Sequence, residues 1–125
     1  KWKKLCQKFI SKYNLNIVIT GTKEDINNGK LLANINKKKI HNYCGKLNIN
    51  QLFNIIKFSE LHITNDNGSM HVATIYNKKT ICLFNNHDPE GKWFPANHKA
   101  KIFRSKKGVN NIKAETVLNF ISNFI

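Results

Sequence analysis

Five residues that suit the binding of an anionic ligand fall within six consecutive positions, Asp66, Asn67, Gly68, Ser69 and His71. Glycine lets the backbone approach a phosphate closely, a carboxylate accepts hydrogen bonds from sugar hydroxyls, and an imidazole can donate to a phosphate oxygen. Each residue alone is more typical of a turn, a cap or a packed ring. Their combination predicts a site for a diphosphate-bearing ligand.

The segments around these residues predict how they are positioned. The apolar run 61–64 is typical of a short strand, residues 66–68 of a tight turn, and residues 70–76 of the start of a helix. In a parallel α/β sheet such a turn lies at the carboxyl end of a strand, beside the unpaired N–H groups of a helix N-terminus. This position favours an anion.

The rest of the chain predicts an alternation of helices and strands. Residues 17–19 form a β-branched run suited to a strand that is buried on both faces, and residues 79–84 and 101–103 predict two further strands. Thr22 is expected to cap a helix over 23–35, and Asn48 to cap the helix before residue 61. Helical spacing of apolar residues is found at Trp2, Leu5, Cys6, Phe9, Ile10 and Tyr13, and again over 115–124.

Residues 66–73, Asp-Asn-Gly-Ser-Met-His-Val-Ala, resemble a known signature. It is the Asp-(Ser/Thr)-Gly-Pro-x-His-(Leu/Val)-Ala block in the C-terminal, donor-binding domain of glycosyltransferase family 9, the ADP-heptose:lipopolysaccharide heptosyltransferases. Residues 16–25 are similar to the strand and glycine turn that precede an acidic donor contact, and residues 43–52 to the Gly-Lys-(Thr/Leu)-(Ser/Asn)-Leu segment. The resemblance continues over 79–84 and 88–95. Three positions depart from it: Asn67 replaces a hydroxyl residue, Ser69 a proline and Asn85 a glycine.

The resemblance implies an α/β fold, a Rossmann-like three-layer α/β/α parallel sheet that forms the C-terminal half of a GT-B glycosyltransferase. Residues 1–125 would be one nucleotide-sugar-binding domain, because a chain of this length makes a single domain and the N-terminal acceptor domain is absent from it. The opening residues indicate the first helix of that domain with no signal peptide before it. The chain by itself is expected to bind donor rather than to turn it over.

The resemblance also implies the reaction and the site. A heptose or related sugar would pass from a nucleotide-diphosphate sugar, most plausibly ADP-heptose, to lipopolysaccharide core or a related surface glycan. His71 would act in catalysis by stabilising the departing diphosphate. Donor contacts would come from Asp66, Asn67, Gly68, Ser69 and His71, and from Glu24 or Asp25. No metal and no cofactor are expected, and the acceptor would be held by the missing domain.

Net charge invites a different interpretation. The chain carries a formal charge of +14, which is typical of nucleic-acid binding. All but one of the basic residues are lysine, Arg104 being the exception, and they are spread through an Asn- and Ile-rich chain, so we predict no nucleic-acid partner. The basic surface would suit a cytoplasmic enzyme in peripheral contact with the anionic inner face of the membrane. Cys6, Cys44 and Cys82 suit reduced thiols.

Two other functions are compatible with the sequence. One is a non-catalytic binding or structural module of the same fold, which the departures at Asn67, Ser69 and Asn85 would suit. The other is a basic nucleic-acid-binding domain, which only the net charge supports. Binding that depends steeply on salt concentration would distinguish the second from a preorganised donor pocket.

Overall fold

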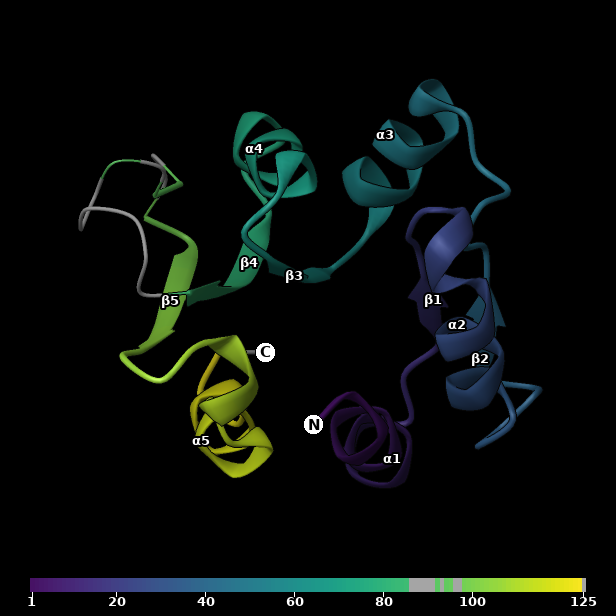
Figure 1. Ribbon diagram of the computed structural model, residues 1–125, viewed down its shortest axis with the longest axis horizontal. Helices are drawn as coiled ribbons and strands as arrows, with labels where there is room; N and C mark the ends of the chain where they lie inside the picture. The colour runs from purple at the N-terminus through teal and green to yellow at the C-terminus, as the bar shows by residue number, and fades with distance from the viewer. Residues whose placement is uncertain (86–91, 93, 96–97, 125) are drawn as a thin grey trace. The chain divides into compact units, whose positions relative to one another are not determined.

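The computed structural model describes residues 1–85, 92, 94–95 and 98–124. These residues divide into two compact units, Lys1–Leu52 and Phe53–Ile125, with the boundary inside helix α3 (Ile49–Phe58). Helices alternate with strands in both units, and all described strand pairs are parallel (Figure 1). The α/β class with parallel sheets is therefore confirmed.

The second unit is built on a three-stranded parallel sheet in the order β3-β4-β5. Its strands are β3 (Leu61–Asn65), β4 (Lys79–Asn85) and β5 (Ala100–Ser105). The central strand β4 is buried along its middle five residues, as expected for a strand covered on both faces. Strands β4 and β5 end together, where Asn85 pairs with Ser105, and β3 ends two residues earlier, where Asn65 pairs with Leu83.

Helices cover both faces of this sheet. Met70 from α4 (Gly68–Ile75) packs with Cys82 and Phe84 on one face, and Phe94 and Ile102 extend this core. Alternation along β5 puts Phe103 on the other face, where its ring meets Phe120 of α5 (Ala114–Ile121) edge-on at 5.8 Å between centroids. The second unit therefore has the three layers of a Rossmann-like fold.

The first unit contains a two-stranded parallel sheet of β1 (Ile17–Ile19) and β2 (Ile40–Asn42). Helix α1 (Trp2–Tyr13) buries Leu5, Cys6 and Phe9, as its apolar spacing predicts. The prediction that β1 is buried on both faces is wrong, because Val18 is 44% exposed. Strand β2 is absent from the sequence-based prediction, since three residues provide too little alternation to detect.

Gly29 allows helix α2 (Ile26–Ala33) to lie against β2. A methyl group at Gly29 would overlap the side-chain amide of Asn42. That amide cannot move aside cheaply, because it donates to the Ile26 carbonyl at 3.2 Å and accepts from the Cys44 N–H at 3.0 Å. The glycine that interrupts the apolar pattern of the predicted helix is therefore a packing requirement.

The remaining helices agree with the sequence in kind and differ at their ends. The helix predicted over 23–35 begins as a 3-10 turn, η1 (Lys23–Asp25), and becomes α-helical only over α2. The C-terminal helix predicted over 115–124 is α5, three residues shorter at its end. Asn48 caps α3 as expected, since its Oδ1 accepts from the Gln51 N–H and the Gln51 side chain accepts from the Asn48 N–H, each at 2.9 Å.

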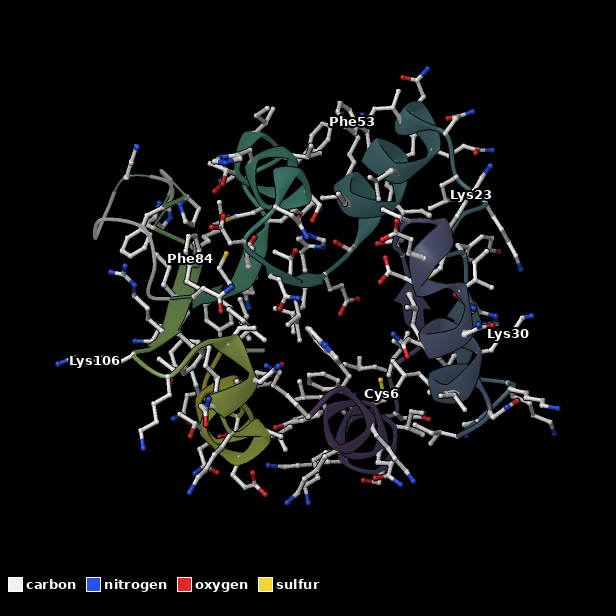
Figure 2. All side chains as sticks on the ribbon, in the orientation of Figure 1. Cys6, Lys23, Lys30, Phe53, Phe84 and Lys106 are labelled. Atoms are coloured by element: carbon white, nitrogen blue, oxygen red, sulfur yellow. The ribbon has the colours of Figure 1, made fainter. Side chains whose placement is uncertain are left out.

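Asn85 and Phe94 lie on either side of the segment that follows β4. Phe94 packs edge-on against Phe84 with ring centroids 5.1 Å apart and so belongs to the core of the second unit (Phe84 is labelled in Figure 2). Trp93 and most of 85–92 lie outside the described residues. Asn85 has a structural task, because its Oδ1 accepts from the Val109 N–H at 2.8 Å and so holds the turn η2 (Val109–Asn111) at the end of β4.

Candidate functional site

The strand–turn–helix predicted around residue 68 is present and well defined. Strand β3 ends at Asn65, and α4 begins at Gly68 with Asn67 as its N-cap. The extended backbone of Asn67 (φ −159°) turns its side chain back onto the helix, where Oδ1 accepts from the Ser69 N–H at 3.0 Å. Asn is among the best N-cap residues, so replacing the hydroxyl residue of the signature by Asn67 does not weaken the cap of α4.

The second departure, Ser69 in place of proline, does not leave the turn loose. Its hydroxyl lies 2.6 Å from Asn67 Oδ1, 3.1 Å from Thr64 Oγ1 and 2.9 Å from His62 Nε2. This side chain therefore joins the turn to two residues of β3. A cyclic residue would restrict φ, whereas Ser69 restricts the turn by hydrogen bonds.

The predicted ligand-binding residues of this turn occupy one end of the second unit. Asp66, Asn67, Gly68 and His71 are exposed, and Ser69 is partly buried. A methyl group added to Gly68 would meet no atom of the described residues within 4 Å, and the φ of Gly68 is not positive. Folding therefore does not require glycine here, and the space beside it is open. His71 follows Gly68 by three residues, so both lie on the same face of α4.

One backbone donor at the start of α4 also remains for a ligand. The Ser69 N–H donates to Asn67 Oδ1, and the Met70 N–H donates to the Asn67 carbonyl at 3.2 Å. The Gly68 N–H, at the first helical position, has no acceptor within the helix. This donor and the positive end of the helix dipole make the start of α4 favourable for a negatively charged group.

The two acidic candidates of the first unit differ in what they do. The Asp25 carboxylate accepts from the Thr22 N–H at 2.8 Å and from Thr22 Oγ1 at 3.0 Å, so it completes a capping box at the start of η1. Glu24 is exposed. The capping role favours Glu24 over Asp25 as the residue that could contact a ligand.

These acidic residues stand beside the Gly-Lys segment that the sequence singles out. The Gly45 N–H donates to the Gly21 carbonyl at 2.9 Å, which joins the turns that follow β1 and β2. Gly45 has φ +69°, and an added Cβ would lie 3.1 Å from the Lys23 backbone, so this close approach needs glycine. The Lys46 ammonium donates to the Asn42 carbonyl at 3.2 Å. The first unit thus gathers an acidic and a basic segment at the carboxyl ends of its strands.

His62 has a place in the site that the sequence did not reveal. It lies on β3, partly buried, with its Nε2 against Ser69 Oγ. Burial lowers the pKa of His62 to about 4, so the ring is neutral at neutral pH. His62 and Thr64 are two positions apart in the strand, so their side chains lie on the same face. This spacing is the only sequence signal that could have indicated the contact.

Cys82 lies below the site and is chemically inert. It is fully buried on β4, and burial, with a smaller contribution from the negative charge of Asp66, raises its thiol pKa to about 12. Cys6 and Cys44 are also buried with raised pKa values, and all three cysteines are free thiols, as predicted. Among the described residues no group of three His, Cys, Asp or Glu side chains could hold a metal ion.

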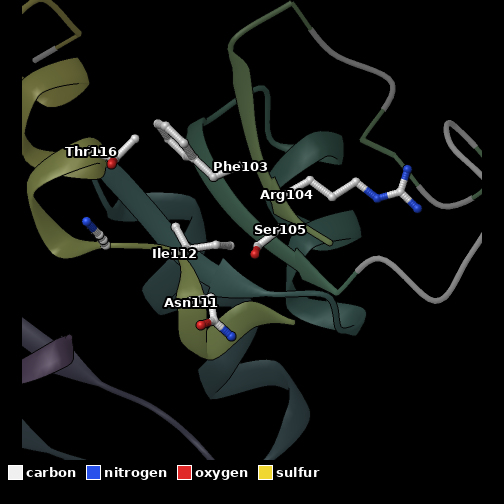
Figure 3. Close-up of a pocket in the computed structure, with 7 residues that line it drawn as sticks. Phe103, Arg104, Ser105, Asn111, Ile112 and Thr116 are labelled. Carbon is white, nitrogen blue, oxygen red and sulfur yellow. The ribbon is translucent and has the colours of Figure 1, made fainter. Parts of the chain in front are cut away.

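A hollow of about 310 Å³ opens at the carboxyl end of β5. Figure 3 shows Phe103 and Thr116 on one side of it, with the Arg104 guanidinium pointing away from them. Ser105, Asn111 and Thr116 supply polar groups to its lining. The hollow lies two strands from α4 along the same edge of the sheet, and the sequence did not indicate it.

The fold and the turn define a class of protein: an α/β domain with an anion-favouring helix N-terminus at the carboxyl end of a parallel strand. The chain belongs to glycosyltransferase family 9 (heptosyltransferase), whose family model matches residues 1–120.

Curated relatives agree with this assignment. The lipopolysaccharide heptosyltransferase 2 of Escherichia coli K12 is 28% identical over 101 residues, which are 78% of this chain and 29% of the relative. A lipooligosaccharide heptosyltransferase 2 of Campylobacter jejuni is 46% identical over 46 residues, 37% of this chain and 15% of the relative. The chain therefore spans less than a third of the length of these relatives.

Solved structures share the fold. The E. coli ADP-heptose lps heptosyltransferase II superposes with a TM-score of 0.84 at 21% identity, over 98% of this chain and 40% of that one. The E. coli heptosyltransferase WaaC with ADP gives a TM-score of 0.85 at 16% identity, over 99% of this chain and 38% of that one. These likenesses bear out the predicted α/β fold with parallel sheets, as in the GT-B heptosyltransferase structures.

Proposed function

We propose that this chain is the donor-binding part of a heptosyltransferase and that it binds the diphosphate of a nucleotide sugar, ADP-heptose, at the start of α4. The observation that carries the proposal is Gly68: no described residue fills the space where its side chain would be, although glycine weakens a helix. A bound phosphate would occupy that space. The family supports this assignment, since a relative of the same fold was solved with ADP.

Each residue of the turn has a proposed contact. The Gly68 N–H and the Asn67 side-chain amide would donate to phosphate oxygens, and the exposed imidazole of His71 would donate from one turn further along α4. Asp66 would accept hydrogen bonds from sugar or ribose hydroxyls, and Glu24 stays the acidic residue that we predict to contact the donor. Ser69 would act by holding Asn67, because its own hydroxyl is already engaged.

The reaction of the whole enzyme would be a displacement at the anomeric carbon. An acceptor hydroxyl of lipopolysaccharide core or a related glycan forms the new C–O bond, and the bond from the sugar to the diphosphate breaks. A base on the N-terminal half takes the proton of that hydroxyl. Negative charge develops on the departing diphosphate, where the start of α4 and His71 stabilise it. We also propose that residues 1–125 act as one nucleotide-sugar-binding domain.

The proposed location is the cytoplasmic face of the inner membrane. The described residues contain no helix that is long and apolar enough to cross a membrane. Exposed lysines such as Lys30 and Lys106 extend outward from the ribbon (Figure 2), and the formal charge is +14. Such charges would attract anionic lipid by about 1 kcal/mol for each lysine near the surface. Sedimentation with anionic vesicles, and none with neutral ones, is the expected result.

The test of the donor site is calorimetric titration of the chain with ADP, UDP and ADP-heptose at moderate salt. Adenine nucleotides should bind selectively, and His71→Ala and Asp66→Ala should each weaken binding. His98→Ala is the matched control, because the exposed His98 precedes β5 and so lies at the opposite edge of the sheet from α4. Absence of binding to any of the three ligands, in a chain shown to be folded by circular dichroism, would refute a self-sufficient donor site.

A further inference from the structure

His62 is a partly buried polar side chain that the proposed ligand contacts do not use. It reaches the candidate site through Ser69, whose Oγ lies 2.9 Å from His62 Nε2. Ser69 in turn lies 2.6 Å from Asn67 Oδ1. The three side chains therefore form a continuous series of hydrogen bonds from β3 to the N-cap of α4.

The direction of these hydrogen bonds follows from the number of hydrogens. The Ser69 N–H can only donate, so the Asn67 atom 3.0 Å from it is the amide oxygen, Oδ1. That oxygen cannot donate, so the single hydrogen of Ser69 Oγ points to it. Ser69 Oγ must then accept from His62, which therefore carries its hydrogen on Nε2. The network requires one specific tautomer of the ring.

Hydrogen-bond donors on the protein side also fix the orientation of the Asn67 amide. Oδ1 accepts from the Ser69 N–H and Ser69 Oγ, and Thr64 Oγ1 lies 3.1 Å from it. With the oxygen held on the protein side, the Nδ2 group and its two hydrogens are left for a ligand, because Asn67 is exposed. An amide rotated by 180° would put its oxygen toward the ligand, where it would repel a phosphate.

We propose that His62 is a positioning residue of the nucleotide-sugar site: through Ser69 it holds the Asn67 amide with Nδ2 directed to the diphosphate. This inference rests on the proposed donor function and adds a residue to it. His62 makes no contact with the ligand. Its effect should be confined to the diphosphate, because Asn67 is the group that it orients.

The experiment measures binding of ADP and of adenosine to the 125-residue chain and to three variants. His62→Leu and Ser69→Ala should each weaken ADP binding about five- to tenfold, the effect of one hydrogen bond, and leave adenosine binding unchanged. His62→Gln keeps an N–H donor at the same distance from the backbone and should restore ADP binding. In an Asn67→Ala background, His62→Leu should have no further effect.

Other outcomes would overturn the inference. Equal losses of ADP and adenosine binding in His62→Leu, or a loss that persists with Asn67→Ala, would show a general structural effect. If the unaltered chain binds no ADP, the donor function fails, and nuclear magnetic resonance still decides the role of His62. The ring must be the Nε2–H tautomer, and His62→Leu must speed hydrogen exchange of the Ser69 amide. A ring with its hydrogen on Nδ1 would refute the proposed orientation.

Discussion

The buried ring of His62 should make the stability of this chain depend on pH. In the folded chain its pKa is about 4, and in the unfolded chain it returns to the ordinary value of 6.5. Between these values the unfolded chain binds more protons than the folded chain, so the free energy of unfolding falls as pH falls. Stability from this group is complete above the unfolded pKa and is lost as pH drops through 6.5 towards 4.

The magnitude follows from the two pKa values. Integration from about pH 7.5 to about pH 5 gives a loss of about 2 kcal/mol, and the loss approaches about 3 kcal/mol below the folded pKa. His62→Gln removes the titrating group and keeps a donor for Ser69. The free energy of unfolding of this variant should therefore fall by about 2 kcal/mol less than that of the unaltered chain between about pH 7.5 and about pH 5. Such an effect is a large fraction of the stability of a small domain.

Urea denaturation at several pH values, followed by circular dichroism, measures this difference. His98→Gln removes an exposed imidazole and serves as the control for the loss of a histidine as such. The comparison between the two variants isolates the buried ring. If the unaltered chain and His62→Gln lose the same free energy between about pH 7.5 and about pH 5, the ring is not buried as described and the reasoning fails.

Four further predictions test separate features. Gly68→Ala should change the free energy of unfolding by less than about 1 kcal/mol, since the added methyl meets no atom in the described part of the chain. The same change should weaken ADP binding, which calorimetry on the same sample would measure. Gly29→Ala should destabilise by about 1–3 kcal/mol in urea, and Asn42→Ala should relieve most of that clash in the double variant. Asn48→Ala should cost about 1 kcal/mol through loss of the capping box, with exposed Asn50→Ala on the same helix as its comparison. The three buried thiols should react with iodoacetamide only after denaturant is added; rapid labelling of the folded chain would contradict their burial.

The sequence by itself determines the local parts of the fold. Apolar spacing in α1, the β-branched run of β1 and the polar turn between β3 and α4 depend on residues close together in the chain, and their types specify the conformation. The same holds for the caps at Asn48 and Asn67, which act within three residues. Family membership also follows from these local blocks, since the signature over 66–73 is continuous.

Tertiary structure alone decided the features that depend on distant contacts. The hydrogen bond from the Val109 N–H to Asn85 Oδ1 joins residues 24 positions apart. Phe94, which follows β4 in the chain, packs into the core against Phe84. The lowered pKa of His62 arises from burial, which no single stretch of sequence expresses. Spacing along the chain encodes only which neighbours share a face of a helix or strand. The contacts between two elements depend on how the sheet is assembled. That assembly places His62 against Ser69, so a histidine with no evident partner in the sequence belongs to the candidate site.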